Sequence, residues 1–300
     1  MSFLRRLFRR KTPAPLVCSV TLDDHGNPVG DDPAHVHSGA CFVDFEPLAL
    51  VELFQSQGCV SCPPAVPTIQ AAVTEQPNRL LLTYNVTLFD HLGWKDTLAS
   101  GGPGGAVGDQ RQRAYVKKWG RNSLFTPQVV VNGLVDTSGA QGGADDVHAA
   151  VHDARAGLRL PFHVFLDAND TEVRIDSDAP APGAAAPAVP SQAADAATDT
   201  TTDTALGTAP ATSPMLPVYD IMVATYHAGD QTVKIGKGPN KGKKLAHRNA
   251  VETVTKIGQW QGGDLTAALP LPKSAWGRGI EAVAFLQEGA GGPIIAATKI

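Results

Sequence analysis

The sequence predicts an α/β domain with a mixed sheet, followed by an all-β domain that a disordered Ala/Pro/Thr-rich insertion interrupts. In the first half of the chain, apolar runs of strand length alternate with segments of helical periodicity. In the last third, apolar runs and turn residues recur with little helical periodicity. The chain has 300 residues, about twice the usual length of one domain, so two domains are expected.

The elements of the predicted α/β domain follow in the order strand, helix, strand, helix, hairpin, helix. A parallel strand pair joined by a crossover helix and followed by an antiparallel hairpin makes a mixed sheet. Asn132-Gly133 favours the type I′ turn of a two-residue hairpin. The predicted strands are 48–54, 80–86, 128–131 and 134–137, and the predicted helices are 68–76, continuing a helix that starts near the cysteines, 109–119 and 145–156.

The predicted all-β domain contains apolar runs on both sides of a tract of unusual composition. Residues 178–214 are mostly Ala, Pro and Thr, without Lys, Arg or aromatic residues, and bury too little apolar surface to offset their ordering entropy. The predicted strands are 161–175, 217–226, 231–235, 250–257 and 280–286. The expected organisation is 1–46 as a basic, loop-rich segment, 47–158 as the α/β domain, and 159–300 as the β domain containing the insertion 178–214.

Charge and hydropathy exclude several classes of function. The net charge is −4, although the first residues are basic. The rest of the chain is therefore acidic, which argues against general nucleic-acid binding. No apolar run approaches the ~20 residues that span a bilayer, so no integral membrane segment is expected. The basic start (Arg5, Arg6, Arg9, Arg10 and Lys11, interleaved with apolar residues) suits an organelle presequence, a peripheral membrane contact or a solvated tail. It argues against secretion, so the expected compartment is the cytoplasm, with the mitochondrion as second choice.

The chemistry of the chain is expected at Cys59 and Cys62, which lie between the first predicted strand and the first predicted helix. At the start of a helix, free backbone N–H groups and the positive end of the helix dipole stabilise a thiolate on the first cysteine. The two-residue spacer allows both sulfurs to meet and form a disulfide. The pair also suits zinc and other metals, but its position after an apolar strand favours redox chemistry.

Two further features sharpen this interpretation. Glu52 lies inside the apolar strand, where burial would raise its pKa and allow it to take a proton from the buried thiol. A carboxylate at a sheet edge, facing solvent, is the alternative. Thr126-Pro127 precedes the third strand, and a cis bond there would present the Thr126 backbone to an extended substrate.

These features together resemble the thioredoxin fold, and the chain is more closely similar to the thioredoxin-like family called domain of unknown function 1223. The resemblance spans about residues 48–300 and implies a thioredoxin-like domain followed by a β domain, with no settled activity. Gly58 replaces the usual aromatic residue before the first cysteine, and two prolines follow the second. The matching stretches are 51–64, 90–96, 111–115, 126–133, 236–243 with His247 and Asn249, and 257–260.

The segment 87–122 between the second strand and Thr126 contains a polar and aromatic cluster, Asp90, His91, Trp94, Lys95 and Asp96. Trp94 and His91 are candidates for contact with substrate, with His91 or Asp96 as an auxiliary proton carrier. The favoured interpretation of the cluster is a capped loop in which Trp94 is an anchor and the charges form surface pairs.

Other signals in the sequence are weaker. Cys18 and Cys41 are isolated, and His25, His35 and His37 with Asp31 and Asp32 could bind copper or zinc together with the cysteine pair. The loop 236–244 alternates glycine and lysine but lacks the Walker spacing, and a hairpin loop is the simpler interpretation.

The expected function is therefore that of a thiol–disulfide oxidoreductase or redox sensor without a cofactor. Cys59 would be the attacking thiolate, Cys62 the resolving thiol and Glu52 the proton acceptor. Its partners would be protein or small-molecule thiols and disulfides. A binding module with a structural disulfide, and a copper- or zinc-handling protein, are the alternatives.

Overall fold

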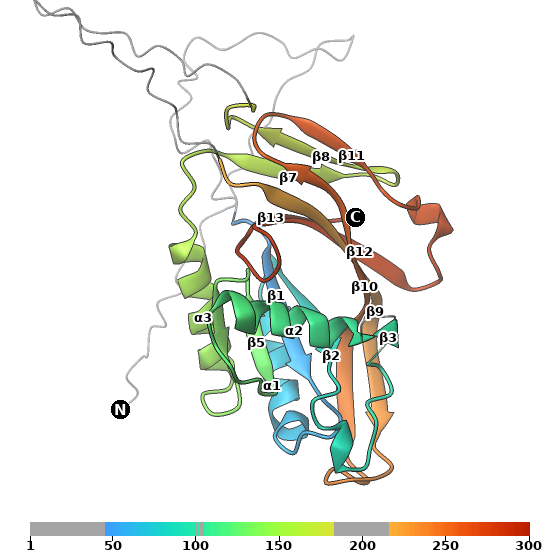
Figure 1. The fold of residues 1–300 in the computed structure, drawn as a ribbon. Coiled ribbons are helices and arrows are strands. Elements are labelled where there is room, and N and C mark those ends of the chain that lie inside the picture. The colour runs from blue at the N-terminus through green and yellow to red at the C-terminus, as the bar shows by residue number, and fades with distance from the viewer. Residues whose placement is uncertain (1–45, 100, 103–104, 183–215) are drawn as a thin grey trace, which may run out of the picture. The chain divides into compact units, whose positions relative to one another are not determined.

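One eight-stranded mixed sheet takes strands from both halves of the chain (Figure 1). The computed structural model describes residues 46–99, 101–102, 105–182 and 216–300, and Pro47–Ile300 form one compact unit. The strand order is β13-β12-β9-β10-β2-β1-β5-β6, which confirms a mixed α/β fold built on a large mixed sheet. Its strands are β1 (Ala49–Gln55), β2 (Arg79–Asn85), β5 (Gln128–Val131), β6 (Val135–Thr137), β9 (Tyr219–Lys234), β10 (Lys244–Trp260), β12 (Ile280–Gln287) and β13 (Ile294–Lys299).

The first half of the sheet follows the predicted order of elements. β1 and β2 are parallel and almost completely buried, as expected for two continuous apolar runs. β5 pairs antiparallel with β1 and forms a hairpin with β6. Asn132 and Gly133 connect that hairpin with φ angles of 48° and 64°, the positive values that a type I′ turn requires.

The second half of the sheet is antiparallel and joins the first half where β10 lies beside β2. The backbone pairing is limited to one register position, Ala250 with Thr83. Side chains reinforce it, since the Thr83 hydroxyl donates to the Arg248 carbonyl over 2.5 Å and the Asn249 amide donates to the Leu81 carbonyl over 2.9 Å. The sequence predicted strands after residue 158 as part of a separate all-β domain. Those that form β9, β10 and β12 instead continue the sheet of the first half.

Two smaller sheets complete the strand structure. β7 (Val164–Ala168), β8 (Glu172–Ser177) and β11 (Leu265–Ala268) form a three-stranded antiparallel sheet, and β3 (Gly101–Gly102) pairs with β4 (Gly105–Ala106). The expected basic segment falls on residues outside the described part of the chain, as does nearly all of the expected insertion 178–214.

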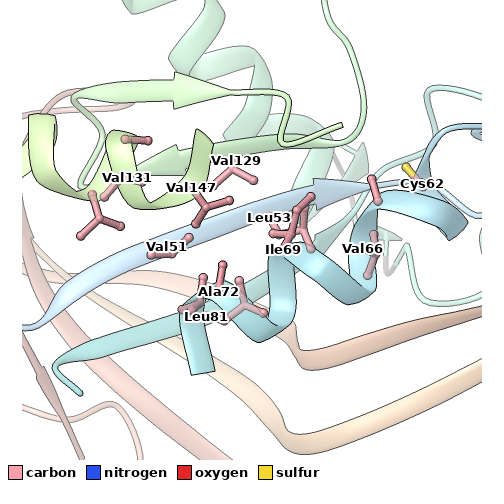
Figure 2. Packing of buried hydrophobic residues seen from close by; sticks show 14 of the residues in the cluster. Val51, Leu53, Cys62, Val66, Ile69, Ala72, Leu81, Val129, Val131 and Val147 are labelled. Atoms are coloured by element: carbon pink, nitrogen blue, oxygen red, sulfur yellow. The ribbon is translucent and has the colours of Figure 1, made fainter. Parts of the chain in front are cut away.

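Helices cover the two faces of the first half of the sheet. α1 (Cys62–Thr74) and α3 (Ala144–Gly157) pack against one face, and α2 (Val107–Lys118) packs against the other. Figure 2 shows α1, α3, β1 and β5 meeting in the first of these cores. Two short 3₁₀ turns are η2 (Asp90–Leu92) and η3 (Lys273–Ala275). No helix within the described ranges is long and apolar enough to cross a membrane.

The alternation of side chains along β1 separates the two cores. Val51 and Leu53 point to the face that α1 and α3 cover, where Cys62 also lies. Leu50 and Phe54 point to the α2 face. Glu52 lies two residues after Leu50 and two residues before Phe54, so its side chain points to the same α2 face.

A buried ion pair connects β1, α2 and β12 on the α2 face. Glu52 is fully buried, and both of its carboxylate oxygens accept from the Arg111 guanidinium, one of them over 3.1 Å. The Tyr115 hydroxyl donates to the same carboxylate, and Arg111 also donates to the Gln287 side chain over 3.2 Å. Every partner of this carboxylate therefore comes from the side of the sheet opposite α1.

Replacing Arg111 by methionine is expected to lower the free energy of unfolding by about 3–5 kcal/mol, because Glu52 would be left as an unpaired buried charge. The double variant Glu52→Leu/Arg111→Met should lose much less, since both charges are removed together. Urea denaturation followed by circular dichroism measures both values. A single variant that is as stable as the double variant would show that the pairing of the two charges does not matter.

Candidate active site

The turn between β1 and α1 holds both cysteines. Cys62 is the first residue of α1, and its backbone N–H donates to the Cys59 carbonyl over 3.3 Å. The Cys59 N–H in turn donates to the Ser56 carbonyl over 3.1 Å. Both thiols are free, with 3% of Cys59 and 0% of Cys62 exposed. Figure 2 shows the Cys62 sulfur at the N-terminal end of α1, close to the end of β1.

Polar groups surround the sulfur of Cys59. Its Sγ lies 3.2 Å from the Ser61 hydroxyl and 3.2 Å from the Thr126 carbonyl oxygen, which accepts from the thiol when it is protonated. The hydrogen bond with the Cys62 side chain makes the largest contribution to lowering the pKa of Cys59 from 9.0 to about 5; Ser61 adds to it, and burial opposes it. Cys59 is therefore a thiolate at neutral pH.

The pKa of Cys62 is shifted in the opposite direction. Burial is the main cause that raises its pKa well above the usual value, and the hydrogen bond and the charge of Cys59 act in the same direction. At neutral pH the pair therefore consists of one thiolate, on Cys59, and one thiol, on Cys62.

The Thr126-Pro127 segment lies directly against this pair. The Thr126-Pro127 peptide bond is cis, and both residues are buried. The Ser61 hydroxyl is also 3.2 Å from the Thr126 carbonyl oxygen, so its single proton can be donated to this carbonyl or to the Cys59 thiolate. The structure thus brings together Thr126, Pro127 and the cysteine pair, as the sequence predicted.

The loop that follows β2 packs on the turn before Cys59. A Cβ atom at Gly58 would lie 2.6 Å from the Phe89 carbonyl oxygen, so this close approach requires glycine. The Trp94 indole N–H donates to the Gln57 side chain over 2.7 Å, and the Asp96 carboxylate accepts from the Gln57 backbone N–H over 2.9 Å. Burial raises the pKa of Asp96 to about 6. Trp94 and Asp96 therefore hold the turn in place.

A second loop, residues 236–243 between β9 and β10, reaches the same turn from the other half of the chain. Asn240 is fully buried, and its side-chain amide donates to the Cys59 carbonyl over 2.6 Å and to the Gln57 carbonyl over 3.0 Å. A Cβ atom at Gly236 would lie 2.7 Å from the Trp94 ring. The two loops thus contact each other as well as the turn, and Figure 1 shows the tip of the β9–β10 hairpin beside the segment after β2.

A buried polar network lies at the ends of β1 and β2. The His247 Nδ1 atom is 2.6 Å from the Gln55 side-chain nitrogen and 2.7 Å from the Asn85 side-chain oxygen. His247 is fully buried, and burial lowers its pKa to about 4, so the imidazole is neutral at pH 7. The network therefore connects three strands beneath the turn without adding a charge.

Glu52 and His91 were also expected at the site, but neither is among the groups that form hydrogen bonds with Cys59 or Cys62. Glu52 is buried, but it lies on the α2 face in its ion pair with Arg111, because side chains at adjacent strand positions point to opposite faces of a sheet. The structure does not bring it to the cysteines. His91 is exposed, and its ring lies 6.2 Å from that of Phe89.

Sequence reasoning did not assign Asn240, His247, Gln57 or Ser61 to the site. The matching stretch 236–243 with His247 marked the first two as part of the family resemblance, and that was the only signal they gave. Cys18, Cys41, His25, His35 and His37 lie outside the described residues. Within the described part of the chain, no three His, Cys, Asp or Glu side chains are grouped to hold a metal ion.

An apolar pocket of about 290 Å³ lies away from the cysteines. It is formed by β9, β10 and the segment around η3, and Val223, Leu269 and Trp276 are among its lining residues. None of its lining residues belongs to the two loops or the turn described above.

Comparisons with known proteins identify a family and one similar fold. The sequence model of the family described as "Protein of unknown function (DUF1223)" matches residues 50–189 and 181–287. The crystal structure of protein AGR_C_4864 from Agrobacterium tumefaciens is similar over 86% of this chain and 96% of that chain, with 27% identity and a TM-score of 0.55. HBP35 of Porphyromonas gingivalis is 12% identical over 85% of this chain and 75% of that chain, with a TM-score of 0.49. No curated protein matches the chain.

The rate at which iodoacetamide alkylates Cys59 in the reduced protein should rise with pH along a titration curve whose midpoint is near pH 5. The rate should then be constant between pH 7 and 9, where an ordinary thiol with a pKa of about 8.5 still gains reactivity. Mass spectrometry of the peptide that contains Cys59 measures the rate.

Two substitutions of Cys62 test the cause of this low midpoint. Cys62→Ser retains a hydrogen-bond donor and should keep the midpoint low, whereas Cys62→Ala removes the largest contribution and should move it upward. The double variant Glu52→Leu/Arg111→Met should leave the midpoint unchanged, since this ion pair lies on the α2 face. Equal midpoints in the serine and alanine variants would contradict the assigned cause.

Proposed function

The chain belongs to the DUF1223 family, and from its site we propose that it is a thiol–disulfide oxidoreductase. The observation on which this rests is the asymmetry of the cysteine pair. Hydrogen bonds with the Cys62 thiol and the Ser61 hydroxyl lower the pKa of Cys59 and favour its thiolate, while Cys62 remains protonated. A thiolate beside a protonated thiol is what the two successive steps of disulfide exchange require.

In the first step, the Cys59 thiolate attacks one sulfur of a substrate disulfide. The bond between Cys59 and that sulfur forms as the substrate S–S bond breaks, and the second substrate sulfur leaves with the electron pair as a thiolate. This leaving thiolate takes a proton from solvent when its pKa is above the ambient pH.

In the second step, Cys62 resolves the mixed disulfide. Burial, the main cause that raises the pKa of Cys62, persists in the mixed disulfide, but the hydrogen bond and the charge of Cys59 that act in the same direction are lost. The Cys62 sulfur attacks the Cys59 sulfur, the bond from Cys59 to the substrate sulfur breaks, and the second substrate sulfur leaves as a thiolate that takes up the proton from Cys62. The protein dithiol has then been oxidised to a disulfide and the substrate disulfide reduced to two thiols.

The exposed side of the turn indicates where the substrate approaches. Val60 is 58% exposed and Ser61 is also exposed, although Cys59 itself is 3% exposed. The Thr126 carbonyl lies on the same side, against Cys59 and Ser61. We assign Thr126-Pro127 as the substrate-facing backbone and Val60 as an apolar contact.

The arrangement of the elements supports a thioredoxin-like assignment of the first half. A strand, the cysteine turn, a helix and a parallel strand are followed by a Thr-Pro segment, a hairpin and a third helix. In this proposal the β9–β10 hairpin serves as a scaffold, because Asn240 in its loop donates to the Cys59 carbonyl and His247 on β10 contacts Asn85 at the end of β2.

The reduced protein is expected to reduce a small disulfide such as hydroxyethyl disulfide, with oxidation of the Cys59–Cys62 pair in a single turnover. Cys59→Ser should abolish this reaction, because no thiolate remains to attack. Release of substrate thiol, measured by its absorbance after trapping, gives the rate.

Cys62→Ser supplies the matched variant for that experiment. It should still attack the disulfide and then stop as a mixed disulfide on Cys59, because the resolving thiol is missing, and intact-protein mass spectrometry detects the adduct. If Cys59→Ser reacted as fast as the unaltered protein, the proposal would be wrong.

A further inference from the structure

The loop 236–243 provides positive charge next to the reactive turn. Lys237, Lys241 and Lys243 are all exposed in this loop, and Lys95 is exposed in the loop after β2 that contacts it. Within the described ranges, neither Lys95, Lys237 nor Lys241 forms an ion pair with a carboxylate. Their charges are therefore available to a ligand.

The loop backbone that carries Lys237, Lys241 and Lys243 is connected to the turn at Cys59. The Lys243 ammonium donates to the Asn240 side-chain oxygen over 3.1 Å, and the amide of the same side chain donates to the Cys59 carbonyl over 2.6 Å. Gly236 and Gly238, on either side of Lys237, lie against the Trp94 side chain. Lys237 thus belongs to a part of the loop that packs closely against Trp94.

The neighbouring carboxylates lower the positive charge of this surface but do not cancel it. Asp96 is buried and accepts backbone N–H groups from Gln57 and Leu98. Asp90 accepts the backbone N–H of Asp96 over 2.9 Å. Two carboxylates face the four exposed lysines Lys95, Lys237, Lys241 and Lys243, so the surface keeps a net positive charge.

We propose that Lys95 and the loop 236–243 form a docking surface for small anionic disulfides, those whose two arms carry carboxylates, beside the Cys59 thiolate. This inference rests on the proposed function and adds the class of substrate to it. The chain as a whole has a net charge of −4, so a local positive surface would favour the approach of such a molecule to Cys59 over approach elsewhere. The exposed side chains of Val60 (58%) and Leu92 (40%) lie next to the surface and suit the uncharged part of the disulfide.

The reaction at this surface is the exchange already described. The reduced protein supplies both electrons for a single turnover, so the test needs no additional reductant. The dithiol becomes a disulfide, and the anionic disulfide leaves as two thiols.

Three disulfides of different charge test the proposal on the reduced full-length protein. Oxidised glutathione is negatively charged at pH 7, hydroxyethyl disulfide is neutral and cystamine is positively charged. The second-order rate constant for oxidised glutathione, relative to the neutral disulfide, should fall by about threefold or more in Lys237→Gln/Lys241→Gln, because electrostatic attraction raises association rates. The same ratio should fall in the unaltered protein when salt is raised to about 0.5 M, which screens exposed charges.

The charge-matched control is Lys117→Gln/Lys299→Gln, which removes two exposed lysines on α2 and β13. It should leave the ratio unchanged, since it alters the net charge but not the surface beside Cys59. An unchanged ratio in the loop variant, or a preference for cystamine, would overturn the docking surface and leave the oxidoreductase proposal intact. Failure of all three disulfides to oxidise Cys59 would instead overturn the oxidoreductase proposal.

Discussion

The contact between β2 and β10 determines how the reactive turn is built. It joins the two halves of the sheet through one backbone register position, and the Thr83 hydroxyl and the Asn249 amide strengthen it. Because β9 and β10 form one long hairpin, this junction also directs the hairpin tip toward the end of β1. Asn240 then reaches the carbonyls of Gln57 and Cys59. The turn is held by residues about 180 positions apart in the sequence, so it belongs to the whole sheet.

The two faces of β1 have different roles: the α2 face holds a structural ion pair, and the α1 face holds the reactive cysteines. On the α2 face, Glu52 and Arg111 satisfy each other as a buried ion pair. On the α1 face, the groups that lower the pKa of Cys59 are hydrogen-bonding groups of Cys62, Ser61 and Thr126, and no charged side chain is among them. Hydrogen bonds therefore favour the Cys59 thiolate without an ion pair at the sulfur. The lysines of the loop 236–243 are exposed, and we assign them to substrate attraction, in contrast to the hydrogen bonds that activate the thiol.

The sequence was sufficient for features that depend on local pattern. The apolar runs predicted β1 and β2, Asn132-Gly133 predicted the hairpin turn, and Thr126-Pro127 was predicted beside the cysteines. Features that depend on long-range pairing were not accessible in this way. No local signal shows that β10 pairs with β2, and so neither Asn240 nor His247 was assigned to the site.

Glu52 shows a different limit of reading the sequence. Its burial was predicted correctly, but the side to which it points depends on strand parity relative to Leu53 and Cys62. Counting alternate positions along β1 would have placed it opposite the cysteines. Its partner Arg111 lies 59 residues away on α2, and only the packing of that helix identifies the pair.

The reduction potential of the Cys59–Cys62 couple tests the central claim most directly. Hydrogen bonds that stabilise the Cys59 thiolate stabilise the reduced form, so they make the couple more oxidising. Equilibration of the protein with a glutathione redox series, followed by thiol quantification, measures this potential. We expect a value between about −270 and −120 mV, the range of catalytic couples, and a value below about −300 mV would identify a structural disulfide and contradict the account.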